Sequence, residues 1–303
     1  MRNQLLSRRR FLRQSTAALA GVGLAHRLSS RAEAGEQTPW PLRLSTSTVQ
    51  FSSLSVEQAC ERIAALGFAA VDFWPAGFGC PHLDEIEKRL GPAGLRDLLA
   101  KHSLKLYAFT CYNVGARAGY SRFAELLGQA GGGVAVREAR YGKITDLTAE
   151  MKAFFEQLKP QLELAEKYHS RIAIENYADS LLNTKDSFKA FVEMNQNPRL
   201  GVALAPYHLQ AAGVPVEEVI GIVGKQLLFF YAWQHADGLK QLPGIGPTDF
   251  TPWLAALARA GYAEYVNPFM HGHPDPEAMA QGLATARDYL VQCHRKATRP
   301  ASL

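Results

Sequence analysis

Short apolar runs alternate with amphipathic segments along most of this chain. Four runs in the second half are rich in β-branched and aromatic residues and have the length of buried strands. Each of the four ends in polar residues, and together they cover residues 172–176, 201–208, 229–235 and 265–273. Polar groups at successive strand ends are where an α/β barrel builds its active site. The candidate chemistry therefore lies at these strand ends.

The first half of the chain continues the alternation. Ser55 is followed three residues later by Gln58, which is the capping-box pattern of a helix start. Further strands are predicted at residues 42–51, 69–74, 104–110 and 134–137, and the fifth strand begins at Arg171. Predicted helices cover residues 55–66, 94–102, 148–169, 184–194, 216–224, 250–260 and 274–292, with one more between residues 120 and 131.

Eight strands alternating with about eight helices over roughly 250 residues is the pattern of a single-domain (β/α)8 TIM barrel. A doubly wound sheet is the structural alternative. No GxGxxG motif opens the first strand–helix turn, and the polar strand ends are spread along the chain. The pattern therefore favours the barrel, with residues 1–34 as a leader, 35–41 as a linker and 42–303 as the barrel domain.

The leader has the composition of an export signal. Residues 7–12 read Ser-Arg-Arg-Arg-Phe-Leu, an apolar lysine-free stretch follows at 15–25, and Ala-Glu-Ala at 32–34 offers a cleavage site. This resembles a bacterial twin-arginine signal peptide; a basic amphipathic helix is the alternative. The apolar stretch is shorter than the roughly 20 residues that span a bilayer. We therefore expect export by the twin-arginine machinery to the periplasm or beyond, without a membrane span.

Removal of the leader changes the charge of the chain. Of 33 basic and 28 acidic residues, seven arginines and one glutamate lie in the leader, which leaves 26 basic and 27 acidic residues. A net charge near zero provides no strong field for nucleic acid, so none is expected as a partner. The four cysteines are too few for a disulfide scaffold. Cys60 is expected to be a buried thiol, and the pairing of Cys80, Cys111 and Cys293 is left open.

Four motifs then appear in a fixed order. Residues 67–74 resemble the segment GFxxVE-aromatic-W, residues 174–176 resemble IEN, residues 242–250 resemble PGxGxxDF, and residues 267–269 lie where ketose epimerases have EPF. In order and spacing the chain resembles the xylose-isomerase-like barrels, the sugar phosphate isomerase/epimerase superfamily, over residues 42–291.

The resemblance implies a metal-dependent reaction. In this family a Glu, an Asp, a His and a Glu on the fifth to eighth strands hold a divalent metal, which binds a ketose carbonyl and the neighbouring hydroxyl. A carboxylate then removes the adjacent carbon-bound proton to give an enediolate. In the epimerases the two glutamates act on opposite faces of the sugar.

Only part of this ligand set is present in the sequence. Glu175 matches the glutamate of the fifth strand. The pattern D-x-x-H on the sixth strand becomes Ala205-Pro-Tyr-His208, so the histidine is kept and the aspartate is lost. Glu175 and His208 are therefore the predicted catalytic residues.

The seventh and eighth strands depart further from the family pattern. The position of the seventh-strand ligand falls on Gln234 or His235, and that of the eighth strand on Asn267. Amide oxygens are weaker ligands than carboxylates for Mg²⁺ or Mn²⁺. With Glu175, these residues and His271 form the candidate metal ligands for Mn²⁺, Mg²⁺, Co²⁺ or Zn²⁺. Asn267 cannot accept a proton, which argues against two-base epimerisation.

Other residues near the strand ends carry two interpretations each. His271 and His273 have the two-residue spacing that points both rings to one side of an extended segment, as metal ligands or as solvent-exposed groups. Asp72 matches the acidic residue of the second strand or forms structural hydrogen bonds. Arg137 is a candidate for an anionic substrate group or a partner of Glu175. Aromatic side chains that could stack on a sugar or fill the core are Trp74, Tyr177, Tyr207 and Trp233.

Three functions compete. The first is an exported isomerase or epimerase that acts on a ketose or related carbonyl sugar by proton abstraction. The second is a non-catalytic carbohydrate-binding barrel, which the losses at Ala205 and Asn267 favour. The third is a metal-dependent phosphoesterase like the apurinic endonucleases of the same fold, which the export signal and the near-neutral charge oppose. The oligomeric state is left open, and a homo-oligomer is compatible with the sequence.

Overall fold

The computed structural model describes residues 40–112 and 119–298. The predicted leader 1–34 and residues 35–39 of the predicted linker lie outside the described residues. In the described part of the chain, no helix is both long enough and apolar enough to cross a membrane.

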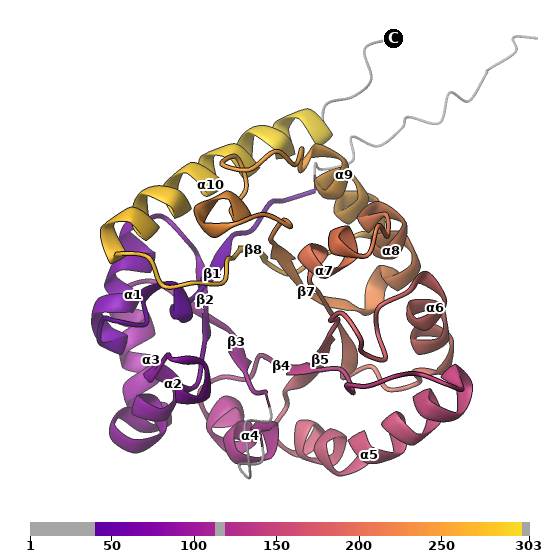
Figure 1. Ribbon diagram of the computed structural model, residues 1–303. Coiled ribbons are helices and arrows are strands. Elements are labelled where there is room, and N and C mark those ends of the chain that lie inside the picture. The colour runs from indigo at the N-terminus through magenta and orange to yellow at the C-terminus, as the bar shows by residue number, and fades with distance from the viewer. Residues whose placement is uncertain (1–39, 113–118, 299–303) are drawn as a thin grey trace, which may run out of the picture. The chain divides into compact units, whose positions relative to one another are not determined.

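Eight parallel strands form one sheet in sequence order, and ten α-helices surround it in the described ranges (Figure 1). The bridge between Leu44 and Val266 brings the first and last strands together. The strands are β1 Ser45–Ser47, β2 Ala70–Phe73, β3 Lys105–Thr110, β4 Val134–Glu138, β5 Arg171–Glu175, β6 Leu200–Leu204, β7 Leu227–Ala232 and β8 Val266–Pro268. The helices are α1 Val56–Ala65, α2 His82–Glu85, α3 Gly91–Lys101, α4 Gly119–Gln129, α5 Leu147–Lys167, α6 Lys185–Met194, α7 Pro206–Ala211, α8 Val216–Val223, α9 Thr251–Ala260 and α10 Pro276–Ala297.

This arrangement confirms the predicted (β/α)8 barrel. The first strand is shorter than predicted, because the chain turns into a 3₁₀ helix at Thr48–Phe51. There the Thr48 hydroxyl accepts the backbone N–H of Trp74 at 3.2 Å. The Thr48 side chain thus satisfies the Trp74 N–H, which a longer β1 would have paired with a backbone carbonyl.

Residues of each strand alternate between two cores. Ile172 and Ile174 of β5 belong to the core between sheet and helices, whereas Ala173 belongs to the core inside the barrel. The same alternation places Val134 and Val136 of β4 inside. Because side chains of a strand alternate with a period of two, the next inward position on β4 is Glu138.

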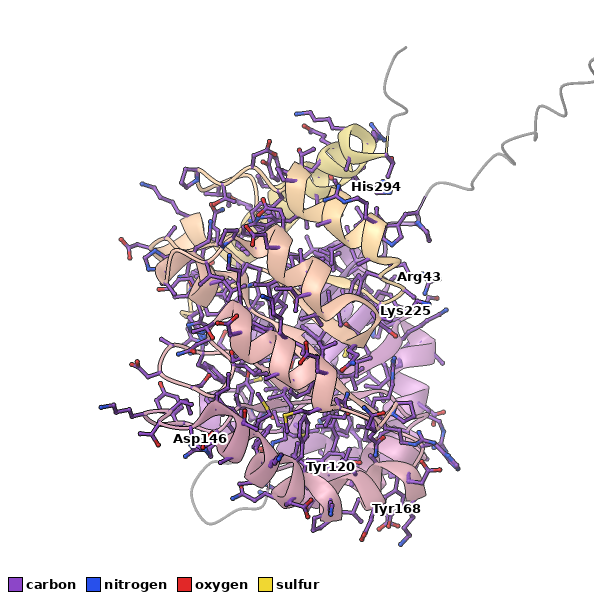
Figure 2. The ribbon with its side chains drawn as sticks, turned by 90° about the vertical axis from the view of Figure 1, so that its right-hand side faces the viewer. Arg43, Tyr120, Asp146, Tyr168, Lys225 and His294 are labelled. Atoms are coloured by element: carbon purple, nitrogen blue, oxygen red, sulfur yellow. The ribbon has the colours of Figure 1, made fainter. Side chains whose placement is uncertain are left out.

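The side view separates the two ends of the barrel (Figure 2). Arg43, Tyr168 and Lys225 precede β1, β5 and β7 and lie at one end, whereas Asp146, which follows β4, lies at the other. Asp146 caps α5, since its side chain accepts the backbone N–H of Ala149 at 2.9 Å. The carboxyl ends of the strands, with their polar tails, therefore share the end marked by Asp146.

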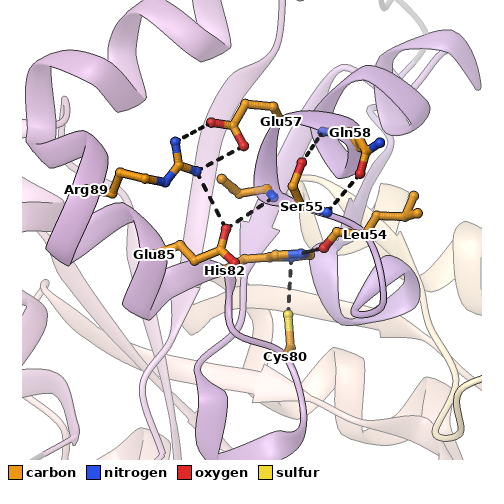
Figure 3. A network of polar contacts seen from close by, with 9 residues as sticks. Leu54, Ser55, Glu57, Gln58, Cys80, His82, Glu85 and Arg89 are labelled. Atoms are coloured by element: carbon orange, nitrogen blue, oxygen red, sulfur yellow. Dashed lines mark hydrogen bonds and ion pairs between the residues drawn. The ribbon is translucent and has the colours of Figure 1, made fainter.

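A network of polar contacts fixes the corner between α1 and α2 (Figure 3). The predicted capping box of Ser55 and Gln58 is present at the start of α1. His82 contacts the Cys80 thiol at 3.2 Å through Nδ1 and the Leu54 carbonyl at 2.9 Å through Nε2. Cys80 and His82 are both fully buried, and burial lowers the pKa of His82. This neutral pair holds the loop that follows β2.

All four cysteines are free and buried. The predicted buried thiol at Cys60 is confirmed, and no disulfide joins Cys80, Cys111 and Cys293. Burial raises the pKa of Cys60 and of Cys80 to about 12 each, so both remain protonated thiols at neutral pH.

Candidate active site

Glu175, the last residue of β5, is the central charged group at the barrel mouth. Its side chain is 3% exposed and accepts a hydrogen bond from the hydroxyl of Tyr112. Burial raises the pKa of Glu175 to about 8, while hydroxyl contacts from Tyr112 and Tyr231 oppose this shift. No cation is among the groups that shift its pKa. Among the residues that the structure describes, Glu175 is therefore a buried carboxyl without a cationic partner, which is an arrangement typical of functional acids and bases.

Three tyrosines surround this carboxyl, and we call Tyr112, Tyr177 and Tyr231 the tyrosine cluster. The rings of Tyr112 and Tyr177 lie 6.1 Å apart. Burial, together with the charge of Glu175, raises the pKa of each hydroxyl well above its usual value. The three hydroxyls are thus neutral and able to donate hydrogen bonds throughout the physiological pH range.

Further aromatic rings cover the tyrosine cluster. Trp74 meets Tyr112 edge-on at 5.6 Å and stacks on Phe269 at 5.3 Å. Trp233 stacks on Tyr207 at 4.3 Å and meets Phe269 edge-on at 5.2 Å. The structure therefore brings together all four predicted aromatic residues, Trp74, Tyr177, Tyr207 and Trp233, and adds Phe269 to them.

Two cavities border the tyrosine cluster. One has a volume of 330 Å³ and is lined by Tyr112 together with Pro75, Asp84 and Arg122. The other has a volume of 220 Å³ and is lined by Tyr177 and His208. A tyrosine of the cluster stands in the wall of each cavity, so small molecules in either cavity would lie one side chain away from the Glu175 environment.

Asp72 is fully buried on β2 and saturated with hydrogen bonds. Its carboxyl accepts from Ser47 at 2.7 Å, from the Trp74 indole at 2.6 Å and from Thr110 at 3.1 Å. Burial raises the pKa of Asp72 to about 7, and these hydrogen bonds oppose the shift. The arrangement supports the structural interpretation of Asp72, since it fixes the orientation of Trp74.

The amide side chains predicted as ligands are occupied by protein groups. Gln234 donates to the Leu242 carbonyl and accepts the backbone N–H of Thr248, both at 2.8 Å. Asn267 donates to the Ser47 hydroxyl at 3.3 Å. Both amides are fully buried. Each therefore serves to hold neighbouring segments of the barrel mouth.

Three of the predicted histidines gather around Trp233 and Tyr207. The His208 ring lies 5.3 Å from Trp233, His235 lies 4.7 Å from Tyr207, and His271 lies 4.7 Å from Trp233. The Nε2 atom of His208 is buried without a hydrogen bond to any described residue. Burial, followed by the charges of His271 and His235, lowers the pKa of His208 to about 4, so its ring is neutral at pH 7.

His273 takes a different course from His271. Its Nδ1 contacts the Ser52 hydroxyl at 3.0 Å, whereas the His271 ring packs against Trp233 and Phe269. Both residues are exposed. Despite the two-residue spacing, the rings of His271 and His273 therefore contact different side chains.

Arg137 does not line the barrel mouth, contrary to the prediction. It donates to Gln161 of α5 at 2.6 Å, and its guanidinium lies over the Phe154 ring at 5.8 Å. Arg137 pairs with Ile174, a residue of the outer core, whereas Glu138 pairs with Glu175. The strand face was misassigned by one residue. The charge of Glu138 contributes to the raised pKa of Glu175.

A family model described as "Xylose isomerase-like TIM barrel" matches residues 60–289. The chain belongs to this family. The predicted family resemblance is thereby confirmed. No curated protein sequence matches the chain.

Several solved structures have a similar fold. The IOLI protein with a binding zinc atom is 17% identical with a TM-score of 0.66, over 84% of this chain and 99% of that one. D-psicose 3-epimerase, solved in the presence of D-fructose, is 15% identical with a TM-score of 0.66, over 84% and 99%. 3-Keto-D-glucoside 4-epimerase YcjR from E. coli is 16% identical with a TM-score of 0.64, over 82% and 100%.

The side chains present here do not fit the divalent metal that this xylose isomerase-like family implies. Among residues 40–112 and 119–298, no group of three or more His, Cys, Asp or Glu side chains is arranged to hold a metal ion. Glu175 is the only carboxylate left of the expected ligands, and it accepts from Tyr112. Ala205 offers no ligand atom, and the amides of Gln234 and Asn267 are engaged as described above.

Sequence reasoning missed three residues of this site. Tyr112 follows β3 directly, and Tyr231 lies within the run 229–235, where it reads as one core aromatic among several. Glu138 was passed over in favour of Arg137. Glu138 is in phase with Val134 and Val136, and Tyr231 is in phase with Phe229 and Trp233, so the period-two alternation of β4 and β7 finds both once the inward face of each strand is known.

Proposed function

We propose that this protein is an isomerase of a small sugar or related carbonyl compound, in which Glu175 is the one proton-transferring base. The observation that carries this proposal is Glu175 itself, which is a buried carboxyl with a raised pKa and no cation beside it in residues 40–112 and 119–298. Burying a carboxyl in this way costs folding free energy, so a catalytic role explains the presence of Glu175 better than a role in packing does. The sugar-processing names of proteins with the same fold give the substrate class.

The proton transfer follows from the carboxyl and its surroundings. Ionised Glu175 removes the proton from the carbon next to the substrate carbonyl, and the C–H electron pair moves onto the carbonyl oxygen to give an enediolate. Returning the same proton to the neighbouring carbon, with a proton exchanged between the two oxygens, gives the isomer. No oxidant or further reactant is consumed. The dry aromatic walls strengthen each hydrogen bond to the intermediate.

Isomerisation is favoured over epimerisation because Asn267 stands at the eighth-strand position where the epimerases have their second base. Inversion at a carbon needs an acid and a base on opposite faces of the sugar. Asn267 on β8 cannot take a proton. Of the two other carboxyls that raise the pKa of Glu175, Asp72 accepts three side-chain hydrogen bonds, and Glu138 stands next to Glu175 in the register of the adjacent strand. A single carboxyl that moves a proton along one face of an enediolate is sufficient for aldose–ketose interconversion.

Solvent exchange tests this proposal directly. Purified protein is incubated in D₂O with a panel of pentoses and hexoses in aldose and ketose forms, and deuterium at carbon is followed by NMR. We expect exchange with at least one sugar, its loss in Glu175→Gln, and its retention in Glu193→Gln, which is the same change at an exposed site on α6. Exchange that persists in Glu175→Gln would overturn the assignment.

A carbohydrate-binding protein without turnover is the second candidate. The complete burial of Gln234 and Asn267 and the loss of a ligand at Ala205 favour it. It predicts saturable quenching of tryptophan fluorescence by a sugar, because Trp74 and Trp233 lie in the aromatic wall. Such binding without any deuterium exchange would support this candidate over the isomerase.

We further propose that the protein acts outside the cytoplasm, on the basis of the arginine-rich leader. Fusion of residues 1–41 to a folded fluorescent reporter should send that reporter to the periplasm of a bacterial host. Replacement of both Arg8 and Arg9 by lysine should abolish this export. Reporter that reaches the periplasm equally with and without the arginine pair would refute the proposal.

A further inference from the structure

The hydroxyl of Tyr231 is an unsatisfied donor inside the site. Tyr231 is 1% exposed, and its hydroxyl forms no hydrogen bond of good geometry with any described residue. Buried hydroxyls in native proteins are nearly always paired, and an unpaired one costs folding free energy. The opposite case exists in the same chain, where the equally buried Tyr120 pairs its hydroxyl with Ser170 at 2.7 Å.

The position of Tyr231 directs this hydroxyl toward the reacting carboxyl. Its ring lies within the inner core, against Phe229 at 4.4 Å and Phe269 at 5.0 Å. After burial, the charge of Glu175 contributes most to the raised pKa of Tyr231, and a hydroxyl contact from Tyr231 in turn opposes the raised pKa of Glu175. The two groups are therefore close to each other. Ala203 of the adjacent strand β6 and Ala205, which follows that strand, belong to the same inner core.

The described residues around Tyr231 include no free group that would neutralise a developing anion. The amides of Gln234 and Asn267 already donate to Leu242 and Ser47. His208 is neutral, and Arg137 points to α5. Tyr112 donates to Glu175. Tyr231 is thus the hydroxyl of the tyrosine cluster that lies within reach of Glu175 and Tyr112 but has no hydrogen bond of good geometry to a described group.

We propose that Tyr231 is a catalytic residue that donates a hydrogen bond to the substrate oxygen on which negative charge develops, and that this site performs its proton transfer without a divalent cation. The proposal rests on the proposed function. The O–H bond of Tyr231 stays intact, because the hydroxyl stabilises the enediolate oxygen by donation. A preorganised neutral donor in a water-free pocket is the arrangement that stabilises such oxyanions best.

The matched pair Tyr231→Phe and Tyr120→Phe tests the assignment. Both changes delete one hydroxyl from a tyrosine that is 1% exposed. Tyr231→Phe should lower kcat by about 10²–10³-fold with a small change in KM, and its melting temperature should stay equal or rise, since an unpaired hydroxyl is removed. Tyr120→Phe should leave kcat unchanged and lower the melting temperature. A Tyr231→Phe variant with full kcat, or with a lowered melting temperature and unchanged kinetics, would overturn the assignment.

Metal content tests the second half of the proposal independently of activity. Protein purified without chelator and dialysed against Mn²⁺, Co²⁺ or Zn²⁺ should contain far less than one equivalent of metal by mass spectrometry, and its melting temperature should not change with EDTA. One tightly bound equivalent that is lost in Glu175→Gln would refute the cation-free site. Failure of the proposed function has a different signature, because no variant or condition would then show exchange at carbon.

Discussion

At the scale of single residues, Glu175 and Asp72 are two buried carboxyls with opposite hydrogen-bond supply. Asp72 accepts hydrogen bonds from three side chains. Glu175 accepts one hydrogen bond, from Tyr112, and lies near the hydroxyl of Tyr231. Burial raises the pKa of both, to about 7 and about 8. The contrast separates a carboxyl that organises the site from one that is kept available for chemistry.

This contrast predicts opposite effects of two isosteric changes. The Asp72 carboxyl accepts hydrogen bonds from the Trp74 indole and two hydroxyls, and Asp72→Asn replaces one of its acceptor oxygens by an N–H donor. We therefore expect a loss of about 2–4 kcal/mol in the free energy of unfolding. Glu175→Gln removes a buried ionisable group and should be neutral or stabilising above pH 7. Urea unfolding at pH 7.5 measures both values. Equal losses in the two variants would refute the distinction.

The pH dependence of catalysis follows from the same carboxyl. The pKa of Glu175 is raised to about 8, so its base form is the minority species at pH 7. We expect kcat to rise with pH through about 8 and then to level off, since the pKa of Tyr231 lies well above that range. A pH–rate profile that is flat from pH 6 to 9 would exclude Glu175 as the base.

Sequence prediction placed a residue correctly where a polar group ended a clear strand, and it misplaced one where the strand face was ambiguous. Glu175 and the four aromatic residues were predicted from their positions after apolar runs. Arg137 was assigned to the mouth because a one-residue shift in register exchanges the two faces of a strand, and Glu138 holds the inward position instead. Tyr231 could not be distinguished from core aromatics, because its role depends on a missing partner that only three-dimensional contacts reveal.

At the scale of elements, the segment between β7 and α9 shows what a glycine motif does. A Cβ at Gly246 would lie 2.2 Å from the Lys240 carbonyl and 2.6 Å from the Gln234 amide carbon. The motif at residues 242–250 therefore lets the backbone pack against Gln234, which in turn holds Leu242 and Thr248.

Gly246→Ala should therefore be strongly destabilising. The contact at 2.2 Å involves a backbone carbonyl, which cannot move without displacing the segment, and we expect a loss of about 2–4 kcal/mol. Gly221→Ala provides the control, because a Cβ there meets nothing within 4 Å inside α8. That change should stabilise the protein by about 0.5–1 kcal/mol. Thermal unfolding of both variants checks the pair, and equal effects would contradict the packing argument.

At the scale of the whole molecule, the barrel was predictable because its signal is repeated eight times. Each apolar run and each amphipathic segment is weak alone, yet their alternation and the missing GxGxxG motif left one architecture. The closed site was not predictable in the same way. Its polar tails were expected to meet a metal. Asn267 instead bonds to Ser47, 220 residues away in the chain, and Gln234 bonds to Leu242 and Thr248 in the loop that follows it. The strand-end pattern of the sequence does not indicate either set of partners.

Global stability should fall as the pH rises from about 6.5 to 8. The folded-state pKa of Glu175 is raised from 4.5 to about 8, so in this window the folded protein holds a proton that the unfolded chain has released, and each pH unit costs about 1.4 kcal/mol. Asp72, with its pKa raised from 3.8 to about 7, acts in the same direction up to pH 7. Below pH 6.5 the lowered pKa of His208 opposes both carboxyls, because the unfolded chain then binds the proton that the buried ring refuses.

Urea unfolding at pH 6.5, 7, 7.5 and 8 measures this slope against its own control. We expect the wild-type protein to lose about 2 kcal/mol across the window, whereas Glu175→Gln should lose only the smaller part that Asp72 contributes below pH 7. The surface variant Glu193→Gln should follow the wild type, since an exposed carboxylate is ionised in both states. Parallel curves for wild type and Glu175→Gln would mean that Glu175 is ionised in the folded protein at neutral pH, and a compensating cation would then have to be sought at the barrel mouth.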